Sequence, residues 1–235
     1  MAQTKIVGGG VLQAGPELAV DPLYNAARVA LRPLDHTNLG AVLGHYRIAA
    51  TSGLVTGIAA GALVYSMRWA PASTPAYCVL LRLLMQSSLT TAFTAAQVVD
   101  YDVIMNRAWT IADTGQTQLT PITGNSQKMR STNMGTSLMN DLRIAGTAAI
   151  TAGTRTPDSQ PFGFCVAPGN TVVSAVSKGD AAQFASMYAA DQPGQGHPVV
   201  FAANEGLNIR NITAFGAVGV VKLYVVAEWA EVMLF

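Results

Sequence analysis

Charged residues are scarce in this chain of 235 residues. They make up 11% of the sequence, and the 14 Lys and Arg nearly balance the 13 Asp and Glu, which leaves a net charge of +1. A surface that binds nucleic acid through several phosphate contacts needs a dense basic patch, so that class of function is not expected. The hydrophobic content of 50% argues against intrinsic disorder. Because few charges protect the exterior against association, we expect copies of the chain or partners to cover much of it.

Cysteine is also rare, and the metal-binding patterns that use it are missing. Cys78 and Cys165 lie far apart without CxxC spacing, and His36, His45 and His197 are isolated from one another. We expect the two cysteines to be small buried apolar side chains, and we expect no zinc site. The first residues lack the apolar core and cleavage site of a secretory signal, so we expect the protein to be made and used in a reducing cytoplasm, at least until assembly.

Motifs for nucleotide binding and covalent catalysis are absent as well. The sequence has no Gly-Lys dipeptide and no GxSxG, and its Gly8-Gly9-Gly10 run does not fit GxGxxG. Asp100-Tyr101-Asp102 has the form of a DxD metal motif, but alternating charge on the solvent side of a strand produces the same pattern, which we favour. Asn211-Ile212-Thr213 is a glycosylation sequon that we expect to stay unmodified without a secretory signal. We predict a protein that is not an enzyme, with no cofactor and no metal.

One uncharged stretch raises the question of a membrane span. Twenty residues from Ile48 to Met67 carry no charge, and they contain Gly53, Gly57 and Gly61 at the GxxxG spacing of transmembrane helices. Thr and Ser side chains interrupt the stretch, and beyond Gly61 its hydrophobicity alternates with a period of two. We therefore expect a pair of β-strands here and no membrane partner.

Alternating hydrophobicity predicts strands in most of the chain. The run from Tyr77 to Met85 is apolar enough for a strand buried on both faces, with a short buried helix as the alternative that periodicity leaves open. Gln97 to Trp109 alternates as a half-buried strand would. The clearest signal spans Val221 to Trp229. It follows an expected strand from Ile209 to Phe215, and the pattern favours a hairpin loop at Gly216-Ala217-Val218-Gly219. Glu205-Gly206 is interpreted as a turn in which Gly supplies a positive φ.

The remaining segments define the organisation. Residues 1–25 are Gly-rich and predict an extended N-terminal arm, and residues 26–235 predict a single domain. Residues 110–160 favour polar loops with short strands, and Ser137 to Ile144 fits either a helical turn or a strand. Gly179 to Ala190 favours a short helix capped by Asp180, with a loop as the alternative. Without a βαβ rhythm, the chain is expected to be all-β and antiparallel, as a sandwich or barrel.

Several segments of the sequence resemble a known family. They are His197-Pro198-Val199-Val200, then Ala203 to Asn211 with its Glu-Gly, then Gly219 to Glu231 with its terminal Trp-x-Glu, together with Tyr46 to Gly53 and Met67-Arg68-Trp69. This pattern resembles the β-sandwich structural proteins of tailed-bacteriophage virions. The resemblance implies a jelly-roll-like antiparallel β-sandwich and a role as a capsid decoration, or cement, protein. It also implies a homotrimer on the capsid exterior, assembled in the host cytoplasm, with the major capsid protein as partner.

On this interpretation the arm reaches the shell or a neighbouring subunit. Its spaced apolar residues are the expected contacts, namely Ile6, Val7, Val11, Leu12, Leu18, Val20 and Leu23. The alternative is a tail or head-tail component, including a receptor-binding or carbohydrate-binding module whose site lies on loops between residues 110 and 160. Few aromatic residues are available there for stacking on sugars, which counts against it.

Overall fold

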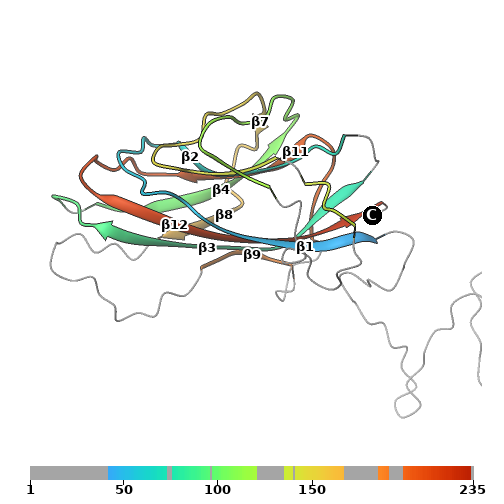
Figure 1. Ribbon diagram of the computed structural model, residues 1–235. Helices are drawn as coiled ribbons and strands as arrows, with labels where there is room; N and C mark the ends of the chain where they lie inside the picture. The colour runs from blue at the N-terminus through green and yellow to red at the C-terminus, as the bar shows by residue number, and fades with distance from the viewer. Residues whose placement is uncertain are drawn as a thin grey trace, which may run out of the picture. The chain divides into compact units, whose positions relative to one another are not determined.

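The computed structural model describes residues 42–72, 76–95, 97–120, 135–139, 141–166, 185–190 and 198–233, all within one compact unit. Within these ranges the regular structure consists of β-strands without any helix, and the strands form two antiparallel sheets that pack against each other (Figure 1). The predicted all-β antiparallel sandwich is therefore confirmed. The predicted arm lies outside the described residues.

The strands are divided between two sheets. The first sheet has the order β1-β12-β3-β10, and β9 also pairs with β3. Its members are β1 (Val42–Thr51), β12 (Val220–Val232), β3 (Tyr77–Thr91), β10 (Val199–Phe201) and β9 (Ala185–Ala189). The second sheet has the order β5-β6-β2-β11-β4-β7, and β8 also pairs with β4. Its members are β5 (Thr117–Leu119), β6 (Asp141–Ile144), β2 (Leu63–Trp69), β11 (Glu205–Asn211), β4 (Asp100–Arg107), β7 (Thr156–Pro157) and β8 (Gly163–Val166).

The connections have the topology of a jelly roll. The chain crosses between the sheets at each step from β1 to β4, and later from β8 to β9, from β10 to β11 and from β11 to β12. Both β9 and β10 pair with β3, so together they occupy one position at the edge of the first sheet. The order β1-β12-β3-β9/β10 thus faces the order β2-β11-β4-β8, which is the two-sheet arrangement of a jelly roll with eight strand positions. Between β4 and β8, strands β5 and β6 extend the second sheet beyond β2 and β7 pairs with β4, and described residues around Asp113 lie on the outer side of the sheet against Asn208 of β11 (Figure 1).

The core lies between the two sheets and follows the alternation of the sequence. On β12 the residues Val221, Leu223, Val225, Ala227 and Trp229 are buried, as predicted, and Lys222, Tyr224, Val226 and Glu228 are less buried. On β4 the buried inward set is Tyr101, Val103 and Met105. Trp69, Trp109 and Trp229 are all fully buried. The two cysteines are free and buried, as expected.

The uncharged stretch from Ile48 to Met67 forms the end of β1, a loop and the start of β2, which confirms the predicted strands. In the ranges that the structure describes, no helix has the length and hydrophobicity to cross a membrane. The undecided segment from Ser137 to Ile144 contains strand β6.

Three local predictions are wrong. The loop at Gly216 is no hairpin, because β11 pairs with β2 and β4 in one sheet and β12 pairs with β1 and β3 in the other. The segment predicted to be a helix ends in β9, because pairing with the edge of β3 outweighs a weak helical preference. Residues 179–184 of that segment lie outside the described ranges. Gly206 does not have a positive φ; the turn before β11 takes its positive φ at Asn204, with a value of 64°.

The outer face of the second sheet is more buried than the sequence indicates. Asp102 was expected on the solvent side of its strand, and Asn106 lies on the same side of β4, yet the two are 5% and 1% exposed. Asp113, from the described part of the segment between β4 and β8, lies on this face against Asn208, and Arg210 of β11 pairs with Asp102. The alternation therefore reports which side of the strand a residue occupies but not whether solvent reaches that side.

Candidate functional site

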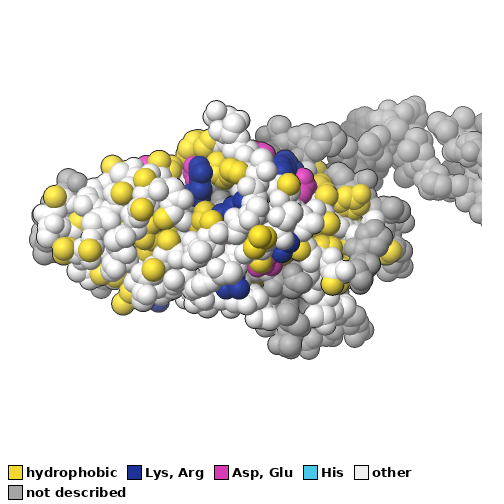
Figure 2. Space-filling model, turned by 90° about the horizontal axis from the view of Figure 1, so that it is seen from above, with side chains coloured by type: hydrophobic (Ala, Val, Ile, Leu, Met, Phe, Trp, Pro, Cys, Tyr) yellow, Lys and Arg dark blue, Asp and Glu magenta, His cyan; other side chains and the backbone are white. Residues whose placement is uncertain are grey.

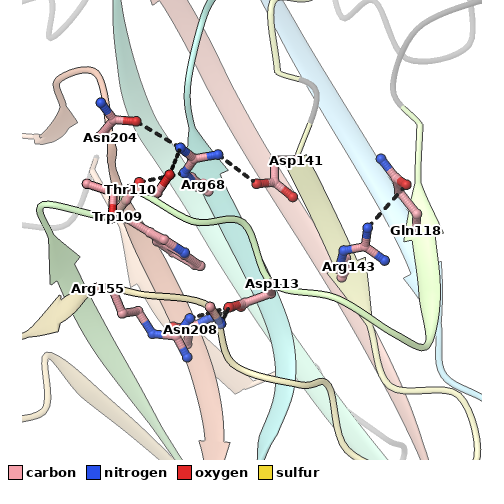
Figure 3. A network of polar contacts seen from close by, with 11 residues as sticks. Arg68, Trp109, Thr110, Asp113, Gln118, Asp141, Arg143, Arg155, Asn204 and Asn208 are labelled. Atoms are coloured by element: carbon pink, nitrogen blue, oxygen red, sulfur yellow. Dashed lines mark hydrogen bonds and ion pairs between the residues drawn. The ribbon is translucent and has the colours of Figure 1, made fainter.

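The densest group of polar contacts lies on this covered outer face (Figure 3). Arg68 of β2 is at its upper end. Its Nε donates to the carbonyl oxygen of Trp109 at 2.8 Å, its Nη1 donates to Asp141 at 3.2 Å and its Nη2 donates to Asn204 at 2.9 Å. These partners belong to the segment after β4, to β6 and to the turn before β11. One guanidinium therefore fastens three separate parts of the chain to β2.

A second centre forms around Asp113, whose side chain is fully buried. Its Oδ1 accepts hydrogen bonds from the backbone N–H of Gly153, at 2.7 Å, and from the guanidinium of Arg155. Its Oδ2 accepts one from Asn208 of β11 at 3.3 Å. Arg155 in turn lies over the ring of Trp109, 4.7 Å from its centroid. The carboxylate is therefore neutralised within the protein and holds the covering segment on the sheet.

A third buried carboxylate, Glu231, lies near the end of β12. It accepts hydrogen bonds from the Ser137 hydroxyl at 2.5 Å, from the backbone N–H of Leu138 at 2.9 Å and from the indole of Trp229 at 3.0 Å. Burial raises the pKa of Glu231, although these donors act in the opposite direction. Its partners are all donors that stabilise a carboxylate, so the group links the first sheet to the segment that precedes β6.

The Asp100-Tyr101-Asp102 motif is used in contacts within the sandwich. Asp100 accepts hydrogen bonds from the backbone and the hydroxyl of Thr213, at 2.9 and 3.1 Å. Asp102 forms a two-pronged ion pair with Arg210 of β11, at 2.6 and 3.0 Å. Among the residues that the structure describes, no group of three or more His, Cys, Asp or Glu side chains is placed to hold a metal ion.

The sequon asparagine also has a structural position. Asn211 is fully buried, and its side-chain amide donates to the carbonyl oxygens of Thr213 at 2.6 Å and Ala59 at 3.3 Å. An oligosaccharyltransferase would have to pull this strand end out of the sandwich to reach the amide. Asn211 therefore acts as a tie between the loop after β1 and the loop after β11.

The thiols have the properties of core residues. Burial raises the pKa of Cys78, with the nearby Glu231 charge as a second cause, and burial also raises the pKa of Cys165. A thiol with a raised pKa is protonated at neutral pH, and the thiolate is the nucleophile. Neither cysteine is prepared for nucleophilic chemistry. The sequence-predicted contact residues of the arm, from Ile6 to Leu23, lie outside the described residues.

Two kinds of exposed apolar surface were missed by the sequence analysis. On β8, Phe164 is 62% exposed and Phe162, just before the strand, is 40% exposed and packs on Tyr188 with ring centroids 5.3 Å apart. At one end of the sandwich, three loops expose Leu54, Val98, Ile212 and Val218. The signal in the sequence was the lack of charge in each loop, although the sequence analysis interpreted only the uncharged stretch from Ile48 to Met67, as a membrane span or a pair of strands.

The buried charges described above are each paired with a donor or cation of the same chain, and the exposed surface includes the apolar side chains just named as well as charged ones such as Arg107. Comparisons with protein-family models, curated proteins and solved structures found no match for the chain.

Proposed function

We propose that the chain is a structural protein of a virion, most simply a capsid decoration protein that self-associates and binds the outside of the shell. It needs no catalytic step. Many copies bound to assembled shells and not to free subunits would stabilise the shell by mass action. Partners on this proposal are the major capsid protein and further copies of the chain.

The observation that carries the proposal is the jelly-roll strand order. Two-sheet jelly rolls are the architecture of viral capsid domains, and they also occur in lectins and cupins. Cupin chemistry uses a metal held by clustered side chains, and the described residues offer no such cluster. The low charge of 11% and the exposed apolar loops favour assembly over the remaining alternatives.

The test is sedimentation with empty shells of the virus whose genome encodes the chain. We expect the full chain to pellet with the shells at a fixed number of copies per capsid subunit and to raise the temperature at which the shells open. A variant lacking residues 1–25 tests the role proposed for the arm, and it should keep the far-ultraviolet circular dichroism of the sandwich while losing the shells. A full chain that stays in the supernatant at all concentrations contradicts the proposal.

A tail or receptor-binding role is the second candidate, and the exposed Phe162 and Phe164 favour it. Aromatic faces that stand in solvent are typical platforms for sugar rings and other flat apolar groups. A glycan array with the purified chain tests this role, with Phe164→Ala as the variant that should lose binding. Copy number separates the candidates, since hundreds per virion fit decoration and a handful fit a tail.

A further inference from the structure

One end of the sandwich is formed by loops that hold one another in place. We call the described residues of 52–62, 92–99 and 212–219 the loop end. Phe93 and Phe215 pack edge to face with ring centroids 5.6 Å apart, and the backbone N–H of Phe215 donates to Ile58 at 3.0 Å. The N–H of Gly216 donates to the side chain of Gln97 at 3.0 Å. Contacts between all three loops therefore fix the shape of this surface before any partner binds.

The described residues of the loop end carry no charged side chain of their own, and a neighbouring carboxylate, that of Asp100 at the start of β4, accepts hydrogen bonds from Thr213 at their border. Leu54, Val98 and Val218 are 53%, 53% and 57% exposed, and Ile212 is 37% exposed. The other exposed positions of these loops are Gly, Ala or Thr, and none of the described residues in them is Lys, Arg, Asp or Glu. In Figure 2 the left end of the molecule, which is also the left end in Figure 1, is mostly yellow and white, and most of the visible charged side chains lie toward the middle and right.

Such a surface is costly to leave in water. Apolar area removed from water contributes about 25 cal/mol per Å², and a preformed surface loses little side-chain entropy when it is covered. Gly and Ala at the surface also let another backbone approach closely. The loop end thus has a fixed shape and loops without charged side chains, whereas strands elsewhere in the protein carry exposed charges. Depletion of charged residues is typical of the core of a protein–protein interface.

We propose that the loop end is the surface through which copies of this chain associate, loop end against loop end around a common symmetry axis. Charge decides the partner. Arg47, Arg107 and Asp158 are exposed on other parts of the sandwich, so a copy docking there would bury charges against an apolar surface. A second loop end presents no charge from its own loops, and the bordering Asp100 carboxylate already accepts two hydrogen bonds from Thr213. Symmetric contact between identical patches closes into a defined oligomer.

This inference shares with the proposed function only the self-association of the chain and does not depend on a shell. The first experiment measures the mass of the purified full chain by light scattering over a range of concentrations. We expect a multiple of the 24.5 kDa chain mass for the natural sequence. The double variant Leu54→Asp with Val218→Asp should be monomeric, with its dissociation constant raised by about 100-fold or more, because each copy would bury carboxylates facing like charges.

Ile111→Asp is the matched control. Ile111 is 58% exposed, but it lies in the segment that covers the second sheet, so the same change of chemistry there should leave the oligomer intact. Circular dichroism and thermal unfolding of each variant report whether the sandwich is folded. A natural chain that is monomeric at all concentrations overturns the inference, and so does a folded double variant that keeps the natural mass.

Cross-linking gives a measurement that needs no destabilising charge. Cys78 and Cys165 are buried, so Val218→Cys adds an accessible thiol to the loop end. A short bismaleimide should join copies of Val218→Cys in high yield and copies of Ile111→Cys in low yield, and equal yields would contradict the inference. The proposed function and this inference fail in different ways. A chain that oligomerises through the loop end but does not bind shells supports this inference and contradicts the proposed function. A monomer that binds shells contradicts this inference.

Discussion

Trp229 and Glu231 stand two residues apart on β12, and the indole Nε1 of Trp229 donates a hydrogen bond to the Glu231 carboxylate at 3.0 Å. The Trp229 ring also stacks on Tyr46 of β1, with centroids 6.0 Å apart. Glu231 then accepts the hydrogen bonds of Ser137 and Leu138. The Trp-x-Glu pattern near the end of the last strand therefore has a structural role, because both side chains make contacts within the sandwich.

Replacing Glu231 by Gln should change how stability depends on pH. Because burial raises the pKa of Glu231 above its ordinary value of 4.5, the folded state holds the proton more tightly than the unfolded state. The contribution of this group is therefore greatest below pH 4.5 and is lost as pH rises through the raised pKa. Glu231→Gln should lack this loss. Urea unfolding at a series of pH values from 4 to 8 measures the difference between the two slopes.

Two neighbours that sense the Glu231 charge do not disturb this measurement. Burial raises the pKa of Tyr46 to about 12 and raises that of Cys78 as well, so both titrate above the window. If the unfolding free energies of the natural protein and Glu231→Gln depended on pH in the same way, the prediction would be refuted.

Gly206→Ala should be strongly destabilising. A Cβ at this position would lie 2.1 Å from the carbonyl oxygen of Met67 and 2.9 Å from the Cα of Arg68, and both are backbone atoms of the neighbouring strand β2. Because a central strand cannot move away from both of its partners, we expect a loss of about 3 kcal/mol. Thermal and urea unfolding measure it.

Gly135→Ala is the control for Gly206→Ala. Nothing lies within 4 Å of a Cβ built at Gly135, so its substitution should change the unfolding free energy by less than about 0.5 kcal/mol. Equal effects of the two substitutions would show that close packing is not the reason for Gly206.

Asp113→Asn should release the segment that covers the second sheet. The change leaves the buried guanidinium of Arg155 without its counter-charge, which costs about 3–5 kcal/mol for a buried pair. Limited proteolysis should then cut the chain between β4 and β8, and unfolding should begin at a lower urea concentration. Asp158→Asn removes a partner of Arg107 from an exposed pair, with side chains 49% and 40% exposed, and should cost less than about 1 kcal/mol. A protease-resistant, stable Asp113→Asn protein would contradict the role given to this carboxylate.

The two natural thiols should not react with thiol reagents in the folded protein. Cys78 and Cys165 are buried and their pKa values are raised, so a water-soluble thiol reagent at pH 8 should modify them only as fast as the sandwich opens. Rapid modification of either thiol without loss of tryptophan burial would show that the core around it is open.

The strands that the sequence predicted correctly are those whose pattern is local. A strand with one buried face places apolar residues at a period of two, as Val221 to Trp229 does. A strand buried on both faces has a continuous apolar run, as Tyr77 to Met85 does. The jelly-roll-like sandwich followed from the resemblance together with this pattern. The arm and its contact residues stay a prediction.

Pairing partners needed the tertiary structure. Ile209 and Val221 lie on strands joined by a short Gly-rich loop, the usual sign of a hairpin, yet the buried Phe215 and the contacts of its loop carry the chain from one sheet to the other. Gly206 was correctly singled out but for the wrong reason, since its role depends on Met67, which is 139 positions away in the chain.

By itself, the sequence determined that this protein is built mainly of strands, which residues of strands such as β4 and β12 face the core, and that the chain carries few charges. Those properties come from side-chain chemistry at neighbouring positions. Only the tertiary structure decided which strands pair, that Asp102 and Asn106 are covered, and that three uncharged loops meet at one end. Each of these depends on contacts between residues far apart in the chain, which no local period records.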